Sequence, residues 1–181
     1  MALIILAHPT FKKSFANKTI IEELQKSDLA IEIRDIAKLY PNYHIDAGTE
    51  QKELLKHKTI VFQYPFYWYN MPAILKQWFD AVFQHQFAFG SKGDKLKGKN
   101  FLPSFTVGGK EKEYNVLEKH HFRVHEFCKN LEQTALFSQM NYIEPIYGYR
   151  TSLADGYTEE EIRDTAKEHA KRLITRLASL K

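Results

Sequence analysis

The amino-acid sequence predicts an α/β fold: a three-layer sandwich in which a five-stranded parallel sheet of order 2-1-3-4-5 lies between two layers of helices. Short apolar runs alternate with amphipathic stretches of helical period along the chain, which is typical of parallel strands joined by right-handed crossover helices. The length of 181 residues suits one domain with a sizeable core. Because no repeat, linker or low-complexity tract interrupts the pattern, we expect a single domain over residues 1–181.

The first half of the chain contains three predicted strands and three predicted helices. The strands are short and either continuously apolar or alternating, and the helices carry apolar residues at helical spacing. We expect strands at residues 2–7, 29–33 and 59–63. We expect helices from the N-cap Ser14 to about Lys26, at 49–57 opened by Thr49, and from Pro72 to about Phe83, with a loop through Pro41.

The second half adds two strands and two helices after a Gly/Lys-rich loop at 85–100. A strand at 101–107 ends in a double glycine, and a helix is expected at about 121–138. A strand at 141–148 contains Pro145, which predicts an edge position or a bulge. The last helix opens at Thr158 with Glu161 three residues later, the pattern of a capping box.

Composition and charge narrow the class of partner. Hydrophobic residues make up 44 % and charged residues 27 %, which is ordinary for a globular protein and argues against disorder. The net charge of +4 favours an anionic partner such as nucleic acid, a phosphate-bearing cofactor or a membrane surface. A single cysteine, Cys128, excludes an intramolecular disulfide framework and a CxxC zinc site, and indicates a reducing, cytoplasmic compartment.

The apolar residues 1–7 are too short to span a bilayer and lack the basic flank of a signal peptide, so a buried first strand is expected. In open α/β sheets, ligands bind where the strands end at their carboxyl sides. The segments that follow the predicted strands at this edge are 8–17, 64–70, 106–114 and about 147–157.

The segment from His8 to Asn17 leaves the first strand and enters the first helix. A helix N-terminus offers free N–H groups and the positive end of the helix dipole, which suit a phosphate. Thr10, Ser14 and Asn17 add side-chain donors, although neither GxGxxG nor a Walker P-loop is present. The alternative is that Ser14 only caps its helix.

Six of the eight residues from 62 to 69 are aromatic, whereas the chain as a whole is 14 % aromatic. Exposed rings are unfavourable unless they pack or stack on something flat, so a planar heterocycle is one candidate partner. The alternatives are that about half of the rings fill the core, that the loop forms a protein interface, or that it stacks on single-stranded nucleic acid. No Lys or Arg lies between residues 59 and 75, which counts against nucleic acid.

Two adjacent glycines, Gly108 and Gly109, follow the fourth strand. They permit either a tight turn or the close approach of the backbone to a ligand. Three neighbouring loops would then hold a phosphate, a flat ring and the edge of that ring, which together describe a flavin site. His121 and His125 have the i, i+4 spacing of a helical metal pair, but no third ligand follows, so we expect a surface or dimer-contact pair and no metal site.

Several motifs in the right order also resemble a known family. They are Ala7-His-Pro9 with Ser14–Asn17, Leu39-Tyr-Pro41 with Ile45-Asp46, residues 62–69 with 72–78, residues 87–90 with 96–99, and Thr106–Gly109. Over nearly its whole length the chain resembles the NAD(P)H:quinone oxidoreductase (DT-diaphorase-like) flavodoxin-fold family. It is similar to the small bacterial members, which include the ancillary flavoproteins of glutathione-gated potassium efflux systems.

The resemblance implies a flavodoxin-like fold and a two-electron hydride transfer from NADH or NADPH through bound FMN to a quinone, by a ping-pong cycle. FAD is less expected, because the chain lacks room for the region that completes an adenine site in larger relatives. The resemblance also implies a homodimer, located in the cytoplasm or peripherally at the inner face of the membrane. Two alternatives remain: a regulatory ancillary subunit of a potassium efflux transporter, and a flavodoxin-type electron carrier, which the basic charge disfavours.

The resemblance also implies roles for individual residues. The cofactor's phosphate end would contact His8, Ser14, Phe15, Ala16 and Asn17. Its isoalloxazine ring would be lined by Phe66, Tyr67, Trp68 and Tyr69, and its pyrimidine edge would contact Thr106, Val107, Gly108 and Gly109. Tyr114 and His120 match in spacing a Tyr and a His that stabilise charge on the reduced flavin. A helix turns by about 600° over six residues, so these two can share a site only if part of the segment between them is loop.

Overall fold

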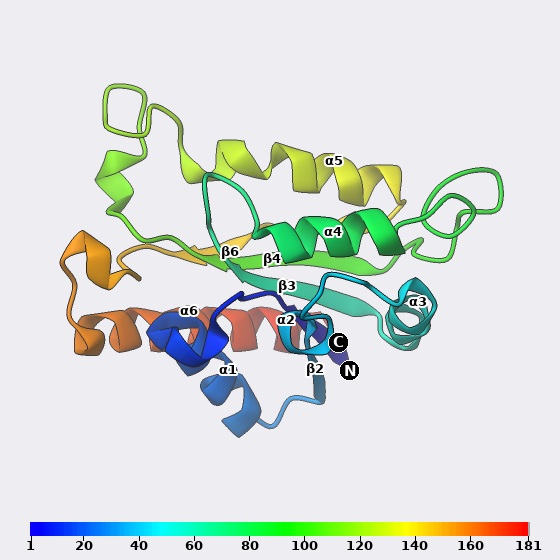
Figure 1. The fold of residues 1–181 in the computed structure, drawn as a ribbon, viewed down its shortest axis with the longest axis horizontal. Coiled ribbons are helices and arrows are strands. Elements are labelled where there is room, and N and C mark those ends of the chain that lie inside the picture. The colour runs from blue at the N-terminus through cyan, green and yellow to red at the C-terminus, as the bar shows by residue number, and fades with distance from the viewer. Residues whose placement is uncertain (181) are drawn as a thin grey trace.

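The computed structural model describes residues 1–180, which form one parallel sheet between two layers of helices (Figure 1). The strands lie in the order β2-β1-β3-β4-β5, and a further strand, β6, also pairs with β4. The predicted order is therefore confirmed, with the fifth position shared by two short strands. The strands are β1 (Ala2–Leu6), β2 (Ile31–Asp35), β3 (Thr59–Pro65), β4 (Asn100–Thr106), β5 (Asn141–Tyr142) and β6 (Ile146–Gly148).

The helices divide between the two faces of the sheet. Helices α1 (Phe15–Lys26) and α6 (Glu159–Ser179) cover one face, and α4 (Ala73–Val82) and α5 (Lys129–Phe137) cover the other, together with α3 (Ala47–Lys56) and the short α2 (Ile36–Leu39) (Figure 1). Because side chains alternate along a strand, Ile4 packs with α1 and α6 while Leu3 and Ile5 pack with the other layer. Four 3₁₀ helices complete the structure, at Phe11–Lys13, Glu111–Glu113, Val124–Cys128 and Leu153–Asp155.

Helix N-caps explain where several helices begin. Ser14 Oγ accepts a hydrogen bond from Asn17 N at 3.1 Å, and the capping box of Thr158 with Glu161 forms, so both predicted starts are confirmed. The predicted opening of α3 at Thr49 is wrong. Asp46 is the cap, and its carboxylate accepts from Thr49 N at 3.0 Å.

The predicted helix over 121–138 is correct only in its second half. Residues 115–123 form turns, and a 3₁₀ helix precedes α5, which begins at Lys129. His121 has a φ of 59°, a left-handed conformation that an α-helix cannot contain. The apolar residues of 121–128 thus gave a helical pattern although the backbone of this segment is not α-helical.

The split of the fifth strand has a backbone cause. Ile143 N donates to Phe101 O, so Phe101 and, two residues later, Pro103 direct their backbone groups to this side of β4. Pro103 has no N–H and faces the gap between β5 and β6, where no ladder bond forms. Pro145 lies in the same gap, so the predicted interruption of an edge strand is confirmed.

One carboxylate is buried in the core. Glu50, on α3, is 0 % exposed and accepts hydrogen bonds from Trp78 Nε1 at 2.9 Å, the Tyr40 hydroxyl at 2.6 Å and Arg34 Nε at 3.1 Å. Through this single charged group, α3 is joined to β2, to α4 and to the residue that follows α2. Cys128 is buried and free. None of the helices within residues 1–180 is both long enough and apolar enough to cross a membrane.

Candidate functional site

A cavity of about 510 Å³ opens at the carboxyl end of the sheet. All four segments that were predicted to follow the strands at this edge contribute to its wall. The predicted site residues that line it are His8, Ser14, Phe15, Asn17, Phe66, Tyr67, Thr106, Gly108, Gly109, Tyr114 and His120. Its volume lies in the range of small-molecule and cofactor sites.

The aromatic segment divides between core and cavity. Phe62 and Tyr64 lie in the core, so the alternative that rings of this segment fill the interior holds for two of the six. Phe66 and Tyr67 line the cavity. Trp68 is 92 % exposed and does not line it.

Three further predicted cofactor residues, Ala16, Tyr69 and Val107, also lie outside the cavity wall. Ala16 and Val107 are buried in the core and contribute only through their backbone positions beside residues that do line the cavity. Tyr69 instead contacts His120, with the Tyr69 hydroxyl 3.2 Å from His120 Nδ1. Tyr69 therefore contacts a lining residue without lining the cavity itself.

The N-terminus of α1 forms one end of the cavity. Ser14 and the cation Lys13 lie here, next to the free amides at the start of the helix. His8 Nδ1 accepts from Thr10 N at 3.1 Å, so the ring hydrogen of the neutral imidazole lies on Nε2. Burial lowers the pKa of His8 to about 4, which keeps the ring neutral at physiological pH.

The double glycine borders the cavity, and a Cβ at either position would meet the end of a neighbouring acidic side chain. A Cβ on Gly108 would lie 2.6 Å from Asp155 Oδ2, and a Cβ on Gly109 would lie 2.8 Å from Glu113 Oε2. Neither glycine has a positive φ, so backbone conformation does not require glycine at either position. Without a Cβ, the backbone at both positions permits the close approach of a ligand.

Tyr114 and His120 lie together at the same end as the double glycine. Their rings stack with centroids 4.0 Å apart, which the turns of residues 115–123 permit and a helix would not. Burial, with the nearby Tyr69, Asp155 and Glu113, raises the pKa of Tyr114 to about 12. Burial, together with Lys119, lowers the pKa of His120. At pH 7 the pair is therefore a neutral phenol beside a neutral imidazole.

Several lining residues were not predicted as site residues. Lys13 and Lys119 add positive charge to the wall. The segment after β6 was predicted as a strand end, but none of its residues was assigned a role. Its lining residues are Thr151, Ser152, Leu153, Ala154 and Asp155. The carboxyl-end rule, applied to the fifth strand as to the others, would have found them.

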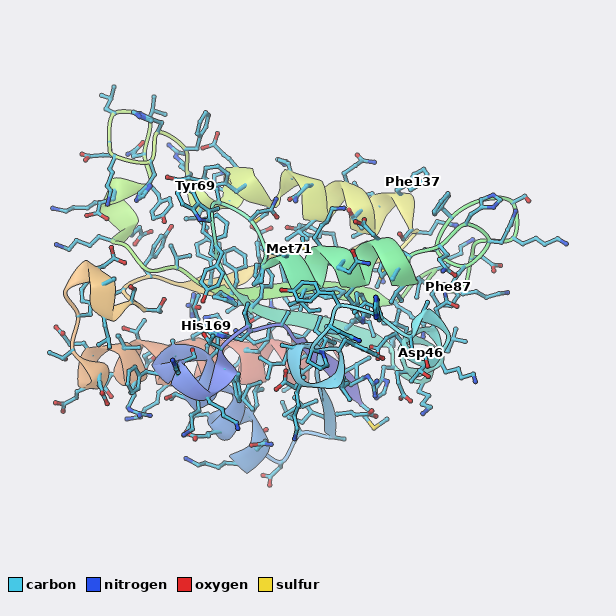
Figure 2. All side chains as sticks on the ribbon, in the orientation of Figure 1. Asp46, Tyr69, Met71, Phe87, Phe137 and His169 are labelled. Carbon is cyan, nitrogen blue, oxygen red and sulfur yellow. The ribbon has the colours of Figure 1, made fainter. Side chains whose placement is uncertain are left out.

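Five buried polar side chains form a network that begins at the cavity wall. Asn17 Nδ2 donates to Thr106 Oγ1 at 3.0 Å, and Gln63 Nε2 donates to Asn17 Oδ1 at 2.8 Å. Ser104 Oγ donates to Gln63 Oε1 at 2.7 Å and lies 2.8 Å from His169 Nε2. The buried network, Thr106–Asn17–Gln63–Ser104–His169, thus runs from the cavity to α6 along the face of the sheet that α1 and α6 cover. Figure 2 shows His169 on the side of the sheet opposite Tyr69.

The burial of His169 predicts a dependence of stability on pH. Burial lowers the pKa of His169 from 6.5 to about 3. Below pH 6.5 His169 is protonated in the unfolded chain but stays neutral in the folded chain. The free energy of unfolding therefore falls as pH decreases from 6.5 toward 3, by up to about 1.4 kcal/mol per pH unit. Urea unfolding at pH 7, 6 and 5 measures this slope. The slope of His169→Leu should be shallower by that amount, and equal slopes would contradict the assignment.

One group of three metal-type ligands is present within residues 1–180. It consists of Glu32, Glu53 and His57, and includes neither His121 nor His125. Both Glu53 carboxylate oxygens already accept from Lys56 Nζ, at 2.8 and 2.9 Å. His57 Nε2 lies 3.4 Å from Glu32 Oε2 and makes no hydrogen bond within residues 1–180.

The sequence of the chain is similar to those of known proteins. A family model described as "Flavodoxin-like fold" matches residues 1–174. The glutathione-regulated potassium-efflux system ancillary protein KefF of Enterobacter sp. (strain 638) is 36 % identical over 174 residues, which cover 96 % of each chain. The uncharacterized NAD(P)H oxidoreductase YrkL of Bacillus subtilis (strain 168) is 35 % identical over 165 residues, covering 91 % of this chain and 92 % of YrkL.

A solved structure is similar in both sequence and fold. General stress protein 14 of Treponema denticola, determined in complex with FMN, aligns with a TM-score of 0.87 and 29 % identity over 99 % of both chains.

Proposed function

Because the chain belongs to the flavodoxin-like fold family, we propose that it is an NAD(P)H:quinone oxidoreductase that works through bound FMN. The observation that carries the proposal is the cavity, where a helix N-terminus, aromatic rings and a double glycine meet at one edge of the sheet. The names of the relatives support it, since YrkL is called an NAD(P)H oxidoreductase and the Treponema protein was determined with FMN.

The cavity residues fit the three chemical parts of FMN. Amides at the start of α1, with Lys13 and the hydroxyl groups nearby, suit the phosphate. Phe66 and Tyr67 provide aromatic surface for the ring system. The backbone at Gly108 and Gly109 borders the cavity without a Cβ and suits the hydrogen-bonding edge of the ring.

Bound FMN would supply hydride chemistry, taking a hydride from NAD(P)H and passing it to a quinone in a second step. The protein's own part is to bind, orient and stabilise charge. Negative charge develops at the ring edge on reduction, and neutral donors fixed beside that edge stabilise it. Tyr114 and His120, whose rings lie next to Gly109, are the residues we assign to this task.

Purification and flavin analysis test the proposal. We expect a yellow protein, or a colourless one that turns yellow with FMN, and release of FMN rather than FAD on heating, identified by chromatography. Oxidation of NADH or NADPH should then depend on an added naphthoquinone, with parallel double-reciprocal lines when both substrates are varied. A chain that binds neither FMN nor FAD would overturn the assignment.

Light scattering at micromolar concentration tests the proposed homodimer, for which twice the chain mass is expected.

The similarity to KefF supports a second candidate function, that of an ancillary subunit of a potassium efflux system. This function requires contact with a membrane protein, whereas the oxidoreductase function requires only small molecules. Deletion of the gene separates the two. If the deletion abolishes glutathione-regulated potassium efflux, and a variant without quinone-reductase activity restores that efflux, the ancillary function is favoured. Efflux unchanged by the deletion would exclude it.

A further inference from the structure

The buried network defined above is closed to solvent except at the end where Asn17 and Thr106 line the cavity. Asn17, Gln63, Ser104 and His169 are each no more than 1 % exposed, and Thr106 is 5 % exposed. Gln63 and Ser104 are register partners on the adjacent strands β3 and β4. Because water does not reach Gln63, Ser104 and His169, their hydrogen bonds must be satisfied within the network, whereas Thr106 can also bond a ligand in the cavity.

Counting hydrogens gives the network a direction. Each hydroxyl has one hydrogen to donate, and each amide has a donor end and an acceptor end. If His169 carries its hydrogen on Nε2, it donates to Ser104 Oγ, and every following bond runs the same way, toward Thr106. If the hydrogen lay on Nδ1, both amides would have to flip and every bond would reverse.

The surroundings of His169 distinguish these two arrangements. Nδ1 is buried and has no hydrogen-bond partner among residues 1–180. A hydrogen on Nδ1 would be an orphaned buried N–H donor, which is rare in folded proteins. Since burial keeps the ring neutral, its one N–H belongs on Nε2, where Ser104 accepts it.

The direction of the network determines what Thr106 offers to the cavity. Its Oγ1 already accepts from Asn17, and no acceptor within residues 1–180 takes its own hydroxyl hydrogen. Thr106 lines the cavity. We propose that His169 is a positioning residue: it fixes the direction of the buried network, so that the Thr106 hydroxyl is a hydrogen-bond donor toward an acceptor atom on the edge of the bound ring. The identity of that ring as FMN rests on the proposed function.

The ring hydrogen of His169 is observable without any ligand. In a long-range ¹H–¹⁵N spectrum of the isotope-labelled protein at pH 7, the His169 signals should show a neutral ring with hydrogen on Nε2. His169→Gln, which removes those signals, assigns them. A ring with hydrogen on Nδ1, or a doubly protonated ring, overturns the proposal. This outcome is independent of whether the protein binds FMN, so its failure is distinguishable from failure of the proposed function.

FMN titration, followed by quenching of flavin fluorescence, tests the consequence at the cavity. Loss of one buried donor should weaken FMN binding about 5- to 100-fold in Thr106→Val and in His169→Leu. Thr106→Ser keeps the hydroxyl, and His169→Gln keeps an N–H donor, so both should stay near the wild-type Kd. The double variant Thr106→Val/His169→Leu should bind FMN no more weakly than Thr106→Val alone, because both substitutions remove the same hydrogen-bond donor, the Thr106 hydroxyl.

Leu173→Ala is the matched control, since Leu173 is buried on the same helix and outside the network. It should destabilise the fold without changing the Kd for FMN. Fully additive effects of the two network substitutions, or a wild-type Kd in His169→Leu, would overturn the proposal. If His169→Leu does not fold, the spectrum of the wild-type protein still decides it.

Discussion

Replacing Glu50 with alanine is expected to lower the free energy of unfolding by about 3–5 kcal/mol. The carboxylate is fully buried and takes hydrogen bonds from Arg34, Tyr40 and Trp78. Its removal leaves the largely buried Arg34 guanidinium without its counter-charge and the indole N–H of Trp78 without an acceptor. Both groups then lack the partners that compensated their loss of hydration.

Urea unfolding at pH 7, followed by circular dichroism, measures this loss. Asp80→Ala is the matched control, since Asp80 pairs with Lys76 on the surface of α4 and its side chain is 58 % exposed. Exposed pairs of this spacing contribute about 0.3–0.5 kcal/mol. The two variants should therefore differ several-fold in their effect, and a loss below about 1 kcal/mol in Glu50→Ala would show that the buried pair does not stabilise the fold as inferred.

Replacing both Tyr114 with phenylalanine and His120 with alanine is expected to lower kcat for quinone reduction about 10- to 100-fold. The stacked pair lies beside Gly109, and both groups are neutral at pH 7, because burial raises the pKa of Tyr114 and lowers that of His120. The pair contributes a phenol O–H and an imidazole where negative charge would develop on reduction. FMN content should be preserved, because the phosphate end of the cavity is untouched.

Steady-state and stopped-flow measurements of each half-reaction locate the effect. Tyr43→Phe with His44→Ala makes the same chemical changes at exposed residues outside the cavity, and its kcat should equal that of the wild type. An unchanged kcat in the Tyr114/His120 variant would remove the pair from the reaction. A change confined to FMN content would reassign it to cofactor binding.

The fold could be predicted from the sequence wherever one periodicity dominated. The continuous apolar run of β1 and the helical spacing of α4 left no competing interpretation, and parallel strands with crossover helices restrict the possible topologies. The prediction of secondary structure failed where the backbone does not adopt the helix that the spacing of apolar side chains indicates. The segment before Lys129 has apolar residues at helical spacing, but the positive φ of His121 breaks any helix there. The cap of α3 was misplaced because Asp46 and Thr49 are both good N-cap residues.

The candidate site was predictable to the extent that it follows strand ends. Asn17, Phe66, Thr106 and Gly109 all lie where a parallel sheet places its ligands. The stacking of Tyr114 on His120 could not be derived, because it depends on turns whose sequence also suits a helix. The buried network could not be derived either, since its members are far apart in sequence and meet only through the strand register and the packing of α6.

The contrast between the two tryptophans provides a pair of intrinsic optical reporters. Trp78 is fully buried in the core and is hydrogen-bonded to Glu50, so its emission should be blue-shifted and protected from acrylamide until the protein unfolds. Trp68 is 92 % exposed on the segment that carries Phe66 and Tyr67, so its emission should be red-shifted and readily quenched. Trp78→Phe and Trp68→Phe would separate the two signals. A single fluorescence titration could then distinguish events on the segment that carries Phe66 and Tyr67 from events in the core.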